Sequence, residues 1–68
     1  MYSIIFTYGS EHDFFKFNNQ KEANKKFNEL KRRVDEYTAK KKYSAVTMSS
    51  TSIYGEEEKV YDNFDAIR

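Results

Sequence analysis

Cysteine, proline and tryptophan are absent from this 68-residue chain, which has two glycines and one histidine. Without cysteine the chain can form neither a disulfide nor a thiolate zinc site. The single histidine, His12, argues against a zinc site built only from protein ligands. A chain this short buries only roughly 60% of the surface of its unfolded form. We therefore expect its stability to depend on aromatic packing or on self-association. Aromatic residues make up 18% of the chain, which is enough to support either.

The sequence also lacks the motifs of common catalytic sites. No glycine-rich loop precedes a helix to hold a phosphate, and no serine lies in a strained, glycine-flanked turn of the kind that marks a nucleophile. His12 with Glu11 and Asp13 is the remaining acid–base candidate, but a chain of this length has little material for a closed, water-poor pocket. We expect a protein that is not an enzyme, with no catalytic residues, no cofactor and no metal.

No apolar run approaches the roughly 20 residues that span a bilayer, and the first residues resemble no signal peptide. We expect a soluble, cytoplasmic protein with no membrane partner. Lysine, asparagine, tyrosine, phenylalanine and isoleucine are abundant, and their codons are rich in A and T. This association suggests a phage-like or mobile-element protein of a low-GC bacterium.

An apolar ladder with steps of four, three, four and three residues predicts one long helix. Its members are Ala23, Phe27, Leu30, Val34 and Tyr37. Asn19 is a favourable N-cap, and Glu22 three residues later resembles a capping box. We predict a helix from about Gln20 to Lys41. The same spacing would suit a coiled-coil seam, but it covers too few heptads to be typical of one.

Short aromatic runs with strand periodicity flank this helix on both sides. Before it, Tyr2–Tyr8 alternates and is followed by a turn at Gly9–His12 and a second strand at Asp13–Phe17. After it come a strand at Tyr43–Ser49 that could extend to Tyr54, a turn at Gly55–Glu57 and a strand at Glu58–Phe64. We predict one small α+β domain over residues 1–68, of order ββαββ, with a four-stranded antiparallel sheet and one long helix packed across one face.

One helix covers one face of such a sheet, whereas alternation sends about half of the strand side chains to the other face. Large apolar groups must therefore lie on the uncovered side: Ile5, one of Phe14 and Phe15, and either Val46 and Met48 or Tyr43 and Ala45. Exposed apolar patches on small chains usually mark interfaces. Three kinds of partner could cover this uncovered face: a second copy of the chain or a further C-terminal helix, a different protein, or stacked nucleic-acid bases.

Charge is unevenly distributed along the chain although its net value is +1. Residues 20–42 carry nine basic and four acidic side chains, whereas residues 53–68 carry five acidic and two basic ones. The run Glu56–Glu58, with Asp62 and Asp65, does not match the spacing of a calcium-binding loop. We interpret it as a charged hairpin turn that could dock on a basic partner.

The function that we predict is binding to an unidentified protein, in which a small homodimeric module modulates or inhibits a host factor. The predicted protein-interface residues are Ile5, Phe14, Tyr54, Glu56, Glu57, Glu58 and Tyr61. The alternative is a small nucleic-acid-binding accessory protein. That alternative would use exposed sheet aromatics and the basic residues Arg32, Arg33, Lys40, Lys41 and Lys42. Against it, acidic residues are interleaved with the basic ones on the predicted helix, which is typical of a solvated surface.

Overall fold

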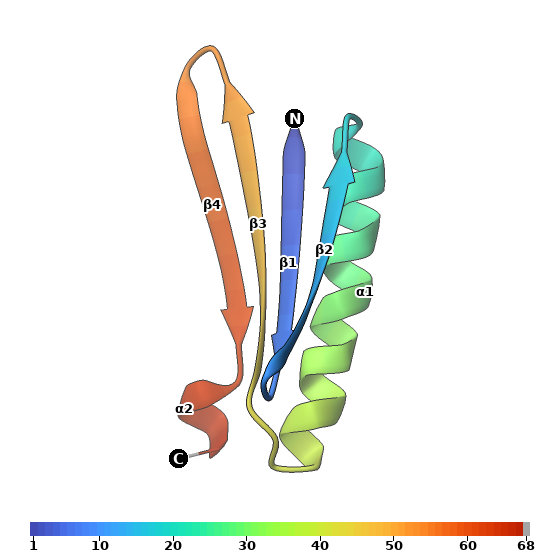
Figure 1. The fold of residues 1–68 in the computed structure, drawn as a ribbon, viewed down its shortest axis with the longest axis vertical. Helices are drawn as coiled ribbons and strands as arrows, with labels where there is room; N and C mark the ends of the chain where they lie inside the picture. Colours follow the sequence, from blue (N-terminus) through green and yellow to red (C-terminus); the bar gives the residue numbers. More distant parts are fainter. Residues whose placement is uncertain (68) are drawn as a thin grey trace.

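The computed structural model describes residues 1–67 and has the order ββαββ, followed by a short C-terminal helix (Figure 1). The elements are β1 (Tyr2–Tyr8), β2 (Glu11–Phe17), α1 (Gln20–Ala39), β3 (Ser44–Ser52), β4 (Gly55–Asp62) and α2 (Phe64–Ile67). The four strands form one sheet in the order β2-β1-β3-β4, and each neighbouring pair is antiparallel. The predicted α+β architecture is confirmed.

The helix α1 packs on one face of the sheet through the predicted ladder. Ala23, Phe27, Leu30 and Val34 are buried, and Tyr37 packs against the same core. The sheet contributes the alternate residues Ile4 and Phe6 from β1 and Val46 and Met48 from β3. The ladder is therefore a helix-to-sheet surface, and Val46 and Met48 are the pair that faces the helix.

The two ends of α1 are capped in different ways. At the start, Asn19 has extended backbone angles and its side-chain oxygen accepts a hydrogen bond from the Lys21 amide at 2.8 Å, as predicted for an N-cap. At the end, the Lys41 amide donates to the Thr38 carbonyl at 3.0 Å and the Lys42 amide to the Tyr37 carbonyl at 2.8 Å. These two bonds form a Schellman motif, in which Lys41 takes the left-handed position with φ of 58°. The helix ends at Ala39, two residues before the predicted end.

Both hairpin turns and the end of the last strand differ from prediction. β2 begins at Glu11, so Glu11 and His12 belong to the strand and not to the first turn, and β4 ends at Asp62, so that Phe64 lies in α2. The β3–β4 turn lies at Ile53 and Tyr54, with Ser52 opposite Gly55, so β4 begins at Gly55 and includes residues predicted to be a turn. The Ser52 hydroxyl accepts a hydrogen bond from the Tyr54 amide at 3.2 Å and closes this turn. The longer strands that result extend the β3–β4 hairpin beyond the adjacent end of β1 (Figure 1).

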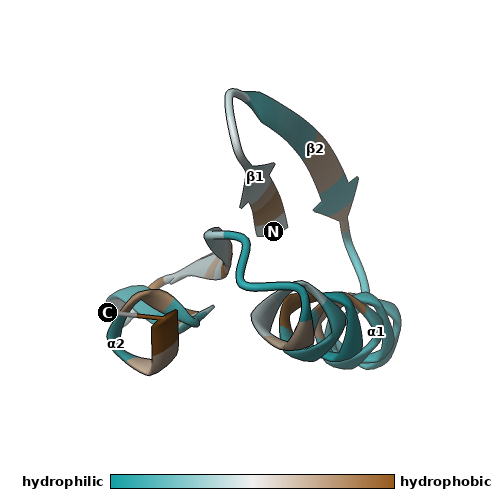
Figure 2. Cartoon of the chain, turned by 90° about the horizontal axis from the view of Figure 1, so that it is seen from below, coloured by the Kyte–Doolittle hydropathy of each residue, from teal (hydrophilic) through white to brown (hydrophobic). Residues whose placement is uncertain are grey.

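The molecule is elongated, measuring 39 × 19 × 18 Å. Seen along the strands, β1 and β2 arch above α1, which is mostly hydrophilic (Figure 2). Contact between α1 and the sheet is densest at β3 and sparsest at β4, so β4 is exposed along nearly all of its length. Within the described residues, no helix has the length and apolar character needed to cross a membrane.

Candidate interaction surfaces

The sheet face away from α1, which we call the outer face, carries a row of mostly apolar residues across all four strands. The strand register aligns Phe14, Ile5, Thr47 and Val60 in this row. Phe14 is 53% exposed, Val60 54% and Ile5 41%. The predicted interface residues Ile5 and Phe14 are thus direct cross-strand neighbours on an open surface, and Phe14 rather than Phe15 is the one that faces outward.

Charged residues lie on both sides of this apolar row. One neighbouring row runs from Lys16 on β2 through Ser3 and Ser49 to Glu58 on β4. The Lys16 ammonium lies 5.5 Å from the centre of the Phe14 ring, a cation–π distance. On the other side, the row runs from His12 on β2 to Asp62 on β4. The outer face therefore has its carboxylates along the β4 edge and its lysine and histidine along the β2 edge.

Tyr61, another predicted interface residue, lies on the opposite sheet face beside α1. Its hydroxyl donates a 2.6 Å hydrogen bond to the Asp35 carboxylate, and the Lys31 ammonium lies 5.0 Å from its ring centre. The hydrogen bond to Asp35, together with desolvation, raises the pKa of Tyr61 above its ordinary value of 10.0. Tyr61 fastens β4 to α1 and is not part of the outer face.

The tip of the β3–β4 hairpin presents the most exposed large apolar side chains among the described residues. Ile53 and Tyr54 are each 93% exposed. The predicted acidic residues follow at once on β4, where Glu56 and Glu58 belong to the outer face and Glu57 to the inner face. The structure thus brings Tyr54 and the acidic run together at one end, although the three carboxylates do not share one face.

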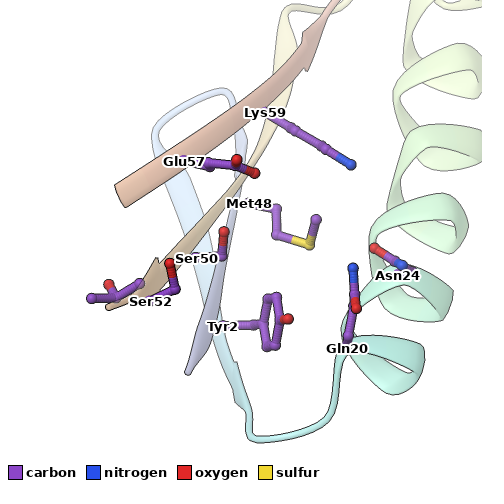
Figure 3. Close-up of a pocket in the computed structure, with 9 residues that line it drawn as sticks. Tyr2, Gln20, Asn24, Met48, Ser50, Ser52, Glu57 and Lys59 are labelled. Atoms are coloured by element: carbon purple, nitrogen blue, oxygen red, sulfur yellow. The ribbon is translucent and has the colours of Figure 1, made fainter. Parts of the chain in front are cut away.

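A polar groove separates this hairpin from the first turns of α1 (Figure 3). It has a volume of about 180 Å³. Lys59 extends from β4 toward α1, which contributes Gln20 and Asn24, while Tyr2 and Met48 lie between them (Figure 3). The groove exists because α1 does not cover the part of the inner face of β4 where Glu57 and Lys59 lie.

An aromatic cleft occupies the other end of the molecule, near the end of α1. It has a volume of about 470 Å³ and is lined by Tyr8, Gly9, Tyr37, Lys42 and Tyr43. The rings of Tyr8 and Tyr37 are stacked, with centroids 5.8 Å apart and planes at 10°. A hydrogen bond to the Glu11 carboxylate, with the nearby charge of Asp13, raises the pKa of Tyr8. The cleft combines flat rings with one cation, Lys42.

The basic residues proposed for nucleic-acid binding do not gather into one patch. The Arg33 guanidinium lies 4.9 Å from the Phe6 ring centre and 5.8 Å from that of Tyr8. Arg32 is exposed on α1 beside Lys25 and Glu29. Lys40, Lys41 and Lys42 form the exposed turn after α1. Arg33 is therefore engaged in packing, and Lys42 is the member that lines the aromatic cleft.

Within residues 1–67, no three histidine, cysteine or carboxylate side chains are arranged to hold a metal ion. Comparisons with protein-family models, curated protein sequences and solved structures found no match. Function therefore has to be inferred from the surfaces of this chain.

Three surface residues were absent from the predicted interface. Ile53 was predicted to extend the strand after the long helix, Val60 was predicted within the last strand but not at the interface, and Lys16 was given no role. The pairing of β4 with β3 decides the positions of Ile53 and Val60 and depends on where the second turn lies, whereas the position of Lys16 follows from the pairing of β2 with β1. Alternation predicted that Val60 and Tyr61 lie on opposite faces of the last strand, as they do, but it did not tell which face α1 covers.

Proposed function

We propose that this chain is a protein-interaction module, not an enzyme, that binds a host protein through its β3–β4 hairpin and modulates or inhibits it. Small size and the residue composition support a phage-like or mobile-element context. The observation that carries the proposal is the pair Ile53 and Tyr54, each 93% exposed at the end of a hairpin that projects from the body. Aromatic and large aliphatic side chains in such positions are typical anchors of protein interfaces.

The chemistry of the hairpin defines the partner that it fits. An apolar pocket would accept Ile53 and Tyr54, while the carboxylates of Glu56, Glu57 and Glu58 would face a basic rim around that pocket. Apolar anchors supply affinity, and rim charges supply orientation and association rate. The partner is therefore a folded protein with an apolar depression surrounded by lysine or arginine.

Comparative affinity capture tests this proposal. The tagged chain, the Tyr54→Ser variant and the Tyr43→Ser variant are each incubated with lysate of the native host, and the retained proteins are identified. Tyr43→Ser is the matched control, because Tyr43 is also exposed but lies at the opposite end. We expect a protein retained by the parent chain and by Tyr43→Ser but lost with Tyr54→Ser. Equal retention by all three chains would contradict the assignment of the hairpin.

A salt series then separates apolar from electrostatic binding. Screening shortens the reach of exposed charges to about 3 Å at 1 M salt. Retention through Ile53 and Tyr54 should persist under these conditions, with slower association as the rim charges are screened. Loss of the complex at moderate salt would instead point to binding through charge alone.

The aromatic cleft favours a second candidate function, binding of single-stranded nucleic acid. Bases stack on aromatic side chains within positively charged grooves. Tyr8, Tyr37 and Tyr43 line this cleft together with Lys42, and Lys40 and Lys41 adjoin it in the sequence. This candidate is weaker, because Arg33 already packs on Phe6 and Tyr8.

A gel shift with random single-stranded oligonucleotides at two salt concentrations tests the second candidate. Binding through phosphates should weaken steeply as salt rises, and Lys42→Glu should weaken it further, whereas Lys25→Glu on the exposed side of α1 should not. The absence of any shift at low salt would eliminate nucleic-acid binding by the cleft.

A further inference from the structure

We propose that the outer face of the sheet binds the outer face of a second copy of this chain, forming a two-fold symmetric dimer. The charge pattern of the outer face indicates that its partner is a second copy of the same face. This surface is distinct from the hairpin tip assigned above to a host partner, so the two proposals can fail separately.

The pattern consists of three parallel rows, each of which crosses the sheet from edge β2 to edge β4. The central row is uncharged and mostly apolar, with Phe14 at one edge and Val60 at the other. One flanking row ends in Lys16 and Glu58, and the other in His12 and Asp62. In both flanking rows the carboxylate is on β4 and the basic side chain is on β2.

A two-fold axis parallel to the strands makes this pattern complementary to itself. Such a rotation lays β2 of one copy over β4 of the other and keeps each row opposite its own equivalent. Lys16 then faces Glu58 of the second copy, and Phe14 faces Val60 of the second copy. Each contact occurs twice, as an isologous interface requires.

The alternative two-fold axis, perpendicular to the strands but in the sheet plane, lays β2 over β2. It exchanges the two flanking rows, so that Lys16 faces His12 and Glu58 faces Asp62 of the second copy. Carboxylates would then oppose carboxylates, which is unfavourable. The charge pattern therefore selects the parallel axis.

The dimensions of packed sheets are compatible with these contacts. Face-packed sheets lie about 10 Å apart with their strands within about 30° of each other. Phe14 and Val60 have the bulk to fill such a gap from opposite edges, and the long side chains of Lys16 and Glu58 can meet across it. Because the axis runs along the strands, both hairpin tips project from the same end of the dimer.

Charge exchange tests this geometry by sedimentation equilibrium across a concentration series. We expect the parent chain to dimerise, and Lys16→Glu and Glu58→Lys each to raise the dissociation constant by about tenfold, through repulsion between like charges at two symmetric positions. The double variant Lys16→Glu with Glu58→Lys should restore dimerisation. Glu57→Lys makes the same charge change on the other face of β4 and should leave the dissociation constant unchanged.

Other outcomes overturn the proposal. A parent chain that stays monomeric at high micromolar concentration would show that a second copy does not cover the outer face. A dimer insensitive to Lys16→Glu and Glu58→Lys, or one that the double variant fails to restore, would show that the chain dimerises with different geometry. Circular dichroism of each variant verifies folding, which is expected to be intact because Lys16 and Glu58 are exposed.

Discussion

At the residue scale, the side chain of Asn63 closes the C-terminal part of the structure. It is 4% exposed and makes three hydrogen bonds. Its oxygen accepts from the Ser44 amide at 2.8 Å, while its nitrogen donates to the Lys42 carbonyl at 2.7 Å and to the Ser44 hydroxyl at 3.2 Å. One amide thus joins the end of β4 to the start of β3, a role that its position in the sequence did not reveal.

Replacing Asn63 with alanine should lower the free energy of unfolding by about 2 kcal/mol, because it leaves buried backbone groups without partners. Asn28→Ala, at an exposed position on α1, is the control and should change stability by less than about 0.5 kcal/mol. Urea denaturation of both variants measures the difference. Equal stability of the two variants would mean that water replaces the Asn63 amide without loss.

The Tyr61–Asp35 hydrogen bond should make stability depend on alkaline pH. The pKa of Tyr61 is raised in the folded state above 10.0, so its contribution to stability is complete below pH 10 and is lost as pH rises through the higher folded value. Denaturation curves of the parent chain and of Tyr61→Phe from neutral pH to above pH 10 measure this. The difference in stability between them should shrink at the alkaline end; a constant difference would exclude the linkage.

At the element scale, the predictable features are those that local sequence determines. The ladder from Ala23 to Tyr37 and the Asn19 cap located α1, because spacing and capping act within a few residues. The β3–β4 turn was placed too late, since Gly55 and the glutamates resemble a turn more than Ile53 and Tyr54 do. Pairing of β3 with β4 settles that choice, and pairing is a tertiary property.

The candidate surfaces could be predicted only in part for the same reason. Alternation showed that Ile5 must face away from Ile4 and Phe6, and it required one of Phe14 and Phe15 to do so. It could not tell that Tyr61 lies under Lys31 and beside Asp35, because those contacts depend on where α1 crosses the sheet.

At the C-terminal end of α1, the left-handed backbone conformation of Lys41 is strained, and a substitution by glycine would relieve that strain. An L-residue in the left-handed region costs roughly 1–2 kcal/mol relative to its favoured conformations, whereas glycine does not bear this cost but loses more backbone entropy on folding. Lys41→Gly should therefore raise the free energy of unfolding by up to about 1 kcal/mol. Lys40→Gly, with φ of −89° at the native position, should not stabilise. Thermal denaturation compares the two variants, and a loss of stability with Lys41→Gly would contradict this interpretation of the cap.

At the scale of the whole molecule, the two faces of the sheet serve different purposes. The inner face packs against α1 to form the core, in which Ile4, Phe6, Leu30 and Val34 are fully buried. The outer face contributes exposed apolar area. Domains have free energies of unfolding of only about 0.05–0.15 kcal/mol per residue. Removing a buried side chain from the core should therefore threaten folding, whereas removing an exposed one from the outer face should not.

Leu30→Ala should destabilise the fold by about 3 kcal/mol, because it removes buried apolar volume and leaves a cavity. Phe14→Ala, on the outer face, should cost less than about 1 kcal/mol when measured on the monomer. Urea denaturation at low protein concentration provides both values. A large loss with Phe14→Ala under these conditions would show that the outer row is needed to fold a single chain.

The strand order β2-β1-β3-β4 determines how the sheet must be assembled. The pairings β1 with β2 and β3 with β4 join neighbours in the chain, and such hairpins form in about 1–10 μs. The pairing of Tyr2–Tyr8 with residues 44–50 instead joins segments that α1 separates. Pairing β1 with β3 closes the longest loop and therefore carries the highest entropic cost of loop closure. We expect the formation of this pairing to limit the folding rate of the chain.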